Sequence, residues 1–298
     1  MHPTHLLIPL PATPDGAPPT LPPALLRLLG HMAPTTRLDT PEEGPALPHE
    51  LVVARHNGLN DEPGHTPWAA FETGTVGTPC AWIKPCHWQV GAQYVALADP
   101  ESLALDTASS EALMRAAAPY FAEDGITLHP ALPGAWLATG EVFRDLCTWS
   151  LERATGRPIT PEMLQASTGH HPGLRRLQSE MQMLFYTHPI NDERQARGQL
   201  PVNAFWVTGA GALAQAHAPR PGLRVDSRLA LGDAQTAWAA IDADIATHWL
   251  PRAQAGQGLQ LTLSGDRAAQ TFNSQPPSLW RRLRRSLSQP DTTFLNTL

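Results

Sequence analysis

The stretch that most limits how this chain can fold covers residues 180–211, where an amphipathic segment leads into an apolar one. Residues 173–186 repeat apolar side chains at helical spacing, which predicts a helix that Pro189 ends. Residues 202–207 are almost entirely apolar, which predicts a buried strand. A helix followed by a buried strand is typical of α/β proteins, in which strands and helices alternate.

A short second helix is expected between these two elements. Asp192 and Gln195 stand three residues apart, as in a capping box that opens a helix. Gly198 suits a left-handed cap at the end of the same helix. The segment before the buried strand is therefore predicted to be a pair of helices.

Other segments continue the alternation of strands and helices. Residues 5–10 and 259–263 predict strands, and residues 269–272 are expected to pair back on the second of these. Asp233 is expected to cap a helix with one apolar stripe. No linker stands out, so we expect a single α/β domain over residues 1–298.

Asn203 is the one polar residue of the buried strand. A buried amide must find hydrogen-bond partners or it costs roughly 1–3 kcal/mol. Gly209 and Gly211 follow at the carboxyl end of the strand, where open α/β sheets present ligand-binding groups and glycines let backbone N–H groups approach an anion. This end of the strand is the first candidate site. If Asn203 faces a ligand there, its removal should cost little stability.

Three polar residues, His188, Asn191 and Arg194, precede the strand. Together with Asn203 they allow two interpretations of this segment. In the first, Arg194 holds a carboxylate or phosphate, and His188 exchanges protons near neutral pH. Asn191 and Asn203 then fix hydroxyl groups of the ligand. In the second, Asn191 caps a helix, Arg194 lies in solvent and Asn203 closes a structural hydrogen-bond network. The sequence leaves both interpretations open.

A second group of chemically specific residues lies within residues 80–91. Cys80, Cys86 and His87 suggest zinc, but the five-residue gap between the cysteines departs from the usual spacing and no second ligand pair follows. Small buried cysteines are the alternative, and whether these three residues bind metal stays open. The polar neighbours of His87 favour a role in binding or in proton exchange.

Residues Gly209 to Ala214 formally match a dinucleotide fingerprint, with Asp226 at a suitable distance for a ribose. Pro219 and Pro221 leave too little room for the crossover helix, so a tight glycine turn is the better interpretation. The sequence has no Gly-x-Ser-x-Gly, P-loop or His-Glu-x-x-His motif. This removes the common hydrolase, NTPase and zincin classes.

Composition narrows the possible partners. A formal net charge of −6 and a pI near 6.1 give no general attraction to nucleic acid or to an anionic membrane. Nothing in the sequence approaches a transmembrane span or a signal peptide, and three cysteines are an odd, sparse set, so we expect a cytoplasmic protein. Residues 278–287 place arginines around leucines, which predicts a solvated amphipathic helix rather than a nucleic-acid patch.

Three segments resemble a known family. Residues 85–91 (PCHWQVG), 182–189 (QMLFYTHP) and 201–211 (PVNAFWVTGAG) are similar to RpfE-type regulatory proteins of proteobacteria, and the likeness covers most of the chain. Residues 188–209 also resemble a signature of archaeal-type cofactor-independent phosphoglycerate mutases, members of the alkaline phosphatase superfamily. The resemblance implies a central, mostly parallel sheet flanked by helices. It also implies a chemistry of two metal ions with a serine nucleophile.

Two positions depart from the mutase pattern. Such enzymes carry an aspartate-glycine directly after the first strand, whereas here residues 11–14 intervene before Asp15 and Gly16. Where the mutases carry an aspartate-histidine pair, this chain has Asp266 and Arg267. A pair of metal ions needs several carboxylates and histidines to hold it, so we predict no metal site and assign no cofactor.

The sequence thus predicts a phosphoglycerate mutase-like protein that binds a small phosphorylated or carboxylated metabolite, with a regulatory role implied by the resemblance. The predicted catalytic residues are His87 and His188, and the predicted binding residues are Asn191, Arg194, Asn203, Trp206, Gly209 and Gly211. An active metal-dependent phosphoglycerate mutase or a related phosphotransferase is one alternative. A structural or protein-interaction module is the other. Neither a membrane nor nucleic acid is an expected partner.

Overall fold

The structure is a computed structural model that describes residues 4–11, 19–91, 94–168, 171–230, 233–275 and 292–298. Contacts between Cα atoms divide the chain into two compact units. The first unit is Met1–Glu43, Leu47–His56 and Pro219–Leu298, and the second is Gly44–Ala46 and Asn57–Ala218. Two compact units can still fold as one domain, so the single domain over residues 1–298 stays a prediction.

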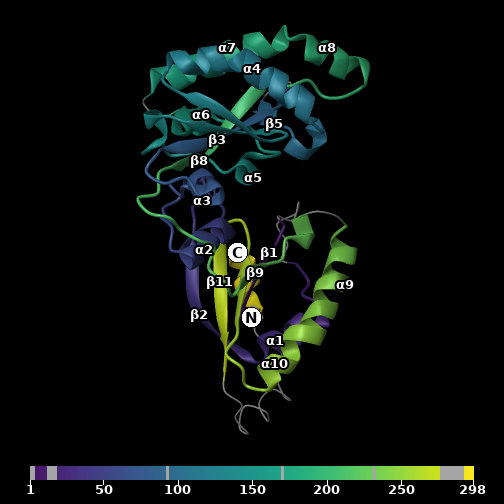
Figure 1. The fold of residues 1–298 in the computed structure, drawn as a ribbon. Coiled ribbons are helices and arrows are strands. Elements are labelled where there is room, and N and C mark those ends of the chain that lie inside the picture. Colours follow the sequence, from purple (N-terminus) through teal and green to yellow (C-terminus); the bar gives the residue numbers. More distant parts are fainter. Residues whose placement is uncertain (1–3, 12–18, 92–93, 169–170, 231–232, 276–291) are drawn as a thin grey trace. The chain divides into compact units, whose positions relative to one another are not determined.

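The first unit is built on a five-stranded mixed sheet (Figure 1). Its strands are β1 (His5–Pro9), β2 (Met32–Asp39), β9 (Leu223–Val225), β10 (Gln260–Ser264) and β11 (Ala268–Ser274). They lie in the order β2-β11-β10-β1-β9. Strand β1 is parallel to both β10 and β9, whereas β11 is antiparallel to β10 and β2.

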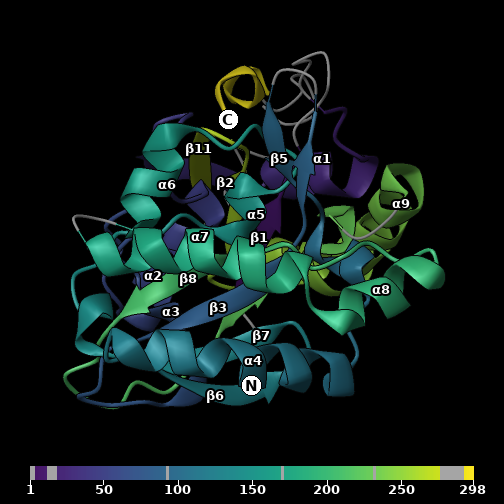
Figure 2. The same ribbon diagram turned by 90° about the horizontal axis from the view of Figure 1, so that it is seen from above.

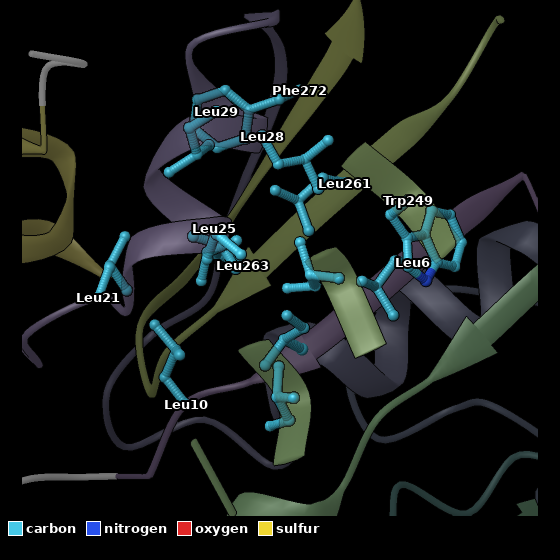
Figure 3. Close-up of a cluster of buried hydrophobic side chains, with 14 of the residues drawn as sticks. Leu6, Leu10, Leu21, Leu25, Leu28, Leu29, Trp249, Leu261, Leu263 and Phe272 are labelled. Carbon is cyan, nitrogen blue, oxygen red and sulfur yellow. The ribbon is translucent and has the colours of Figure 1, made fainter. Parts of the chain in front are cut away.

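One face of this sheet holds the core of the first unit. Apolar residues of β1 and β10, including Leu6 and Leu261, pack against helices on that face (Figure 3). The helical elements on this side are α1 (Pro23–Leu29), α9 (Ala234–Asp244), the π-helical turn η4 (Ile245–Trp249) and α10 (Leu250–Gln254). Asp233 caps α9 as predicted, and Trp249 is buried in the core (Figure 3).

The opposite face of the same sheet is more polar, because the strands alternate. Leu6 and Leu261 belong to the core, so their neighbours His5, Gln260 and Thr262 point the other way. The helix α2 (Pro48–Asn57) contributes side chains on this second face. The sheet is therefore apolar toward α1 and α9 and partly polar toward α2.

The second unit has a four-stranded sheet in which every pairing is antiparallel. Its strands, in the order β6-β7-β3-β8, are β6 (Thr127–Leu132), β7 (Ala135–Thr139), β3 (Cys80–Cys86) and β8 (Ala204–Gly211). A separate hairpin is formed by β4 (Trp88–Val90) and β5 (Val95–Leu97).

Helices cover both faces of the second sheet (Figure 2). The helices of this unit are α3 (Trp68–Thr73), α4 (Thr107–Glu123), α5 (Leu151–Ala154), α6 (Pro161–Thr168), α7 (Pro172–Tyr186) and α8 (Pro189–Ala196). Leucines and phenylalanines of α4 and α7 pack against β3 and β8 on one face. On the other face, Trp206 packs with residues of α5 and α6.

Short 3-10 turns complete the described chain. They are η1 (Pro100–Leu103), η2 (Glu141–Phe143), η3 (Arg228–Ala230) and η5 (Thr293–Thr297). Within the described ranges, every helix is too short or too polar to traverse a bilayer. The predicted basic helix over residues 278–287 lies outside the described residues.

The mixed α/β composition agrees with the sequence, but a mostly parallel sheet is not confirmed. Only the pairings of β1 with β9 and β10 are parallel in the described sheets. For two of the antiparallel pairings, the reason is the length of the connection between the strands. A turn of a few residues links β10 to β11 and β6 to β7, and so short a link permits only antiparallel pairing, since parallel strands need a long crossover.

Candidate functional site

Most of the polar residues predicted to bind a ligand converge instead on a backbone segment of the second unit, residues 200–203. Asn191 is buried, with 3% of its surface exposed. Its Nδ2 donates to the Phe185 carbonyl at 2.6 Å and to the Val202 carbonyl at 2.7 Å, and its Oδ1 accepts from the Val202 N–H at 2.8 Å. The amide of Asn191 therefore joins the end of α7 to the chain that enters β8.

Arg194 makes a similar connection from α8. Its Nε donates to the Leu200 carbonyl at 2.9 Å and its Nη2 donates to the Leu103 carbonyl, while Nη1 has no hydrogen-bond partner in the described part of the chain. Burial lowers the pKa of Arg194, and the nearby charge of Asp106 opposes that change. Arg194 is only 1% exposed, so the interpretation that places it in solvent is wrong. A ligand could reach it only if the surrounding chain opened.

Asn203 and His87 bond to the backbone at the same place. Asn203 stands just before β8 rather than inside the strand as predicted. Its Oδ1 accepts from the Trp88 N–H at 2.7 Å, and its Nδ2 donates to the Trp88 carbonyl at 3.0 Å. His87 Nδ1 lies 2.8 Å from the Pro201 carbonyl, which can only accept, so Nδ1 carries a proton. These contacts hold the start of β4 against the segment before β8.

His188 and Trp206 also serve the local scaffold. The His188 side chain caps α8, its Nδ1 accepting a backbone N–H two residues further on at 3.3 Å. Pro189 occupies the first turn, so the helix begins before Asp192 and the predicted capping box is wrong. Trp206 is fully buried, and its Nε1 donates to the Trp149 carbonyl at 3.0 Å.

Gly209 and Gly211 lie within β8, where the sequence predicts a turn beyond the strand. Gly209 has a φ of 65° and Gly211 a φ of 148°, values that favour glycine. A Cβ atom on Gly209 would lie 2.9 Å from Cβ of Trp68, and one on Gly211 would lie 2.8 Å from Cβ of Pro67. The two glycines therefore let β8 approach α3 closely, which is a packing role.

Cys80 and Cys86 are both buried and unpaired. Burial raises the pKa of the Cys80 thiol to about 11 and also raises the pKa of the Cys86 thiol. Because the thiolate is the form that binds metal, burial here disfavours that form. Among the described residues, no group of three or more histidine, cysteine, aspartate and glutamate side chains is arranged to hold a metal ion.

A cavity of about 200 Å³ lies on the polar face of the sheet in the first unit. Its walls come from β1, β2, β10, β11 and α2. The lining residues are His5, Thr36, Leu38, Val52, Arg55, His56, Gln260, Ala269 and Thr271. This set includes one arginine and two histidines but no carboxylate, so its potential charge is positive. We call this space the sheet cavity.

Strand register brings the polar residues of the sheet cavity together. Thr271 pairs with Thr262 on one side and with Thr36 on the other. His5 pairs with Gln260, which makes Thr262 its diagonal neighbour on the same face. Since side chains of paired residues share a face, residues far apart in the sequence form one polar row.

Hydrogen bonds link three of these side chains in a line. Nε2 of His5 lies 2.7 Å from Oγ1 of Thr262, and that oxygen lies 2.8 Å from Oγ1 of Thr271. Thr262 is fully buried, and Thr271 lines the sheet cavity. These polar atoms thus form a continuous row along one face of the sheet, and His5 and Thr271 at its two ends both line the sheet cavity. We call it the His5 chain.

The two histidines of the sheet cavity differ in environment. Their rings meet edge to face, with centroids 6.3 Å apart. Burial and the charge of His56 lower the pKa of His5 to about 4, so His5 is neutral at pH 7. His56 is half-buried, and its Nε2 lies 3.1 Å from the Arg220 carbonyl, which requires a proton on Nε2.

The sheet cavity was not predicted from the sequence, although a signal was present. His5 is a polar residue in the otherwise apolar strand β1, which is the same pattern that singled out Asn203, and Thr262 is a polar residue of the alternating strand β10. The pattern identifies a residue that needs a partner. It does not distinguish a backbone partner from a side chain that borders a cavity.

Comparisons with known proteins find only distant likenesses. No protein-family model and no curated protein matches the chain. Among solved structures, the cofactor-independent phosphoglycerate mutase from Thermoplasma acidophilum DSM 1728 is 14% identical, with 99% of this chain and 94% of that chain covered and a TM-score of 0.38. The PH0037 protein from Pyrococcus horikoshii is 11% identical, with coverages of 92% and 88% and a TM-score of 0.39. Such low scores carry no argument about this chain, and the RpfE-type resemblance is not confirmed.

Proposed function

We propose that this protein binds a small phosphorylated or carboxylated metabolite in the sheet cavity of its first unit. The observation that supports the proposal is the lining, which sets Arg55 and His56 beside the hydroxyl-bearing Thr36 and Thr271 without any carboxylate. Groups that can carry positive charge, together with neutral donors, form the usual recognition set for an oxyanion. A regulatory outcome of binding, implied by the resemblance to RpfE-type proteins, belongs to the same proposal.

The size of the sheet cavity favours a small ligand. Its volume of about 200 Å³ is below the roughly 300–1,000 Å³ of pockets that enclose drug-sized molecules. Leu38, Val52 and Ala269 form the apolar part of the lining and would pack against a short carbon skeleton. A ligand with a charged group on a few carbon atoms matches both halves of the lining.

Each polar group of the cavity has a distinct part in the proposal. The planar guanidinium of Arg55 can bind two oxygens of a carboxylate or phosphate at once. His56 donates Nε2–H to the Arg220 carbonyl, so Nδ1 is the ring atom left for a ligand, and it donates to an oxyanion only when the imidazole carries both protons. The Gln260 amide adds a neutral donor. The metabolite class is thus the one expected from the sequence, while the proposed site is a different one.

Isothermal titration calorimetry with inorganic phosphate, followed by a panel of phosphorylated and carboxylated metabolites, tests the proposal. Arg55→Gln should weaken binding about tenfold, equal to about 1.4 kcal/mol. Arg27→Gln is the matched control, because Arg27 is exposed on α1, which packs on the opposite face of the sheet. An absence of heat across the panel, or equal affinities for the two variants, would reject the sheet cavity as the binding site.

A further inference from the structure

We propose that Thr271 is the hydroxyl that donates a hydrogen bond to the oxyanion in the sheet cavity, and that Thr262 and His5 orient this hydroxyl through the hydrogen bonds of the His5 chain. The inference rests on the proposed function and adds the residues that select the ligand. Thr271 lines the cavity, as His5 does, and it is the residue proposed to donate to the ligand. Thr262 and His5 are positioning residues for its hydroxyl.

The geometry of the His5 chain allows only two proton arrangements. A threonine hydroxyl has one proton to donate and can accept through its lone pairs. Thr262 lies 2.7 Å from Nε2 of His5 and 2.8 Å from Oγ1 of Thr271, so its proton points to one of them and it accepts from the other. The direction of one hydrogen bond therefore fixes the direction of the next.

The two arrangements present different groups to the cavity. If Nε2 of His5 lacks a proton, Thr262 donates to it, Thr271 donates to Thr262, and only the lone pairs of Thr271 remain for a ligand. If Nε2 carries the proton, it donates to Thr262, Thr262 donates to Thr271, and the Thr271 proton is available to the cavity. An anionic oxygen needs a donor, so it selects the second arrangement.

The change between these arrangements balances without a net proton. The neutral imidazole of His5 gives up the proton on Nδ1 to water and takes one from water on Nε2, and both hydroxyl protons of the chain reverse direction while they stay on their oxygens. No covalent bond of the ligand changes. The site therefore favours a deprotonated carboxylate or phosphate oxygen over a neutral hydroxyl of similar size, because only the former needs the donor that the His5 chain provides.

Nothing in the sheet itself requires the Thr262 hydroxyl. The backbone groups of β10 are used in pairing with β1 and β11, and the residues beside Thr262 are leucines. A buried hydroxyl is less favourable than an apolar side chain of similar size unless it is bonded. Here its partners are two side chains, His5 and Thr271, rather than the backbone. This distinguishes the His5 chain from the hydrogen bonds between side chains and backbone groups around residues 200–203.

Calorimetry of the full chain with inorganic phosphate tests the inference. Thr262→Val should weaken binding about tenfold, the effect of one hydrogen bond to a charged group. Thr262→Ser restores the hydroxyl and should bind within about twofold of the unmodified chain. The matched control is Thr35→Val, which removes an exposed threonine hydroxyl that donates to the backbone carbonyl of Thr271 at 3.3 Å. It should leave the affinity unchanged.

Nitrogen-15 NMR of the His5 ring supplies a second, independent readout. Phosphate should move the His5 signals from the Nδ1–H toward the Nε2–H tautomer in the unmodified chain, a change that a merely structural role would not produce. If Thr262→Val does not fold, this measurement decides alone. Phosphate binding with stationary His5 signals, or with equal affinities for Thr262→Val and Thr35→Val, overturns the inference while the proposed function stands. No phosphate or metabolite binding at all rejects both.

Discussion

Two groups of largely buried polar side chains, one in each unit, bond to different kinds of partner. In the second unit, Asn191, Arg194 and Asn203 bond to backbone groups and fasten separate segments to one another. In the first unit, His5 and Thr262 bond to other side chains, and both ends of that chain border a cavity. Both groups contain buried side chains, so their hydrogen-bond partners, and not their burial, distinguish them.

The largest expected effect tests the scaffold side of this comparison. Asn191→Ala removes three hydrogen bonds and leaves the Val202 N–H and two carbonyls buried without that partner, so stability should fall by about 4 kcal/mol. Denaturant unfolding measures the loss. Gln195→Ala, at an exposed position of the same helix, should stay within about 0.5 kcal/mol. Similar losses of stability for the two variants would mean that the hydrogen bonds of Asn191 contribute little to stability.

The next effect concerns pH and the first unit. The pKa of His5 is lowered from 6.5 to about 4 in the folded chain, so protons bind the unfolded chain first as the pH falls. Folding stability attributable to His5 should therefore drop between about pH 6.5 and pH 4, by at most about 3 kcal/mol. Denaturant unfolding over this range, for the unmodified chain and for His5→Gln, isolates the contribution. Parallel pH profiles would show that His5 is not held neutral.

Asn203 gives a smaller effect and decides between the two interpretations made from sequence. Because both ends of its amide bond to the Trp88 backbone, Asn203→Ala should lower stability by about 2 kcal/mol without ligand. Phosphate should stabilise this variant as much as it stabilises the unmodified chain. A small loss of stability combined with a lost phosphate effect would return Asn203 to the list of ligand-binding residues.

The smallest expected effect on stability tests the role of the sheet cavity in ligand binding. Thr36 lines the sheet cavity and is exposed, so Thr36→Val should change stability by less than about 0.5 kcal/mol while it weakens phosphate binding about threefold. Thr35→Val, one residue away, should change neither quantity. Thermal unfolding and calorimetry on the same samples provide both values. A clear loss of stability at unchanged affinity would make Thr36 a scaffold residue.

Local structure could be predicted from the sequence where neighbouring residues determine it. The strand at residues 5–10 was predicted, and so were the cap at Asp233 and the pairing of residues 259–263 with 269–272. Each depends on alternation or on a cap, which are properties of neighbouring residues. The direction of pairing between distant strands, as between β1 and β10 or β3 and β8, was not predictable in this way, because it depends on which distant strands meet.

The candidate site was harder to predict for a related reason. Asn203 and Thr262 look alike in sequence, since each is a polar residue with an apolar residue on either side. Their roles can be distinguished only by their partners: Asn203 bonds to the Trp88 backbone, and Thr262 bonds to the His5 side chain. Both contacts join residues more than a hundred positions apart, which no local pattern encodes.

The division of the first unit into separated segments has a consequence for synthesis on the ribosome. Strand β1 cannot find its parallel partner β10 until most of the chain has emerged, on the order of ten seconds or more at typical elongation rates. The second unit lies between these segments and is completed earlier. The sheet cavity, with walls from β1, β2, β10 and β11, is thus among the last features to be assembled. Nascent chains that stop before β10 would lack it entirely.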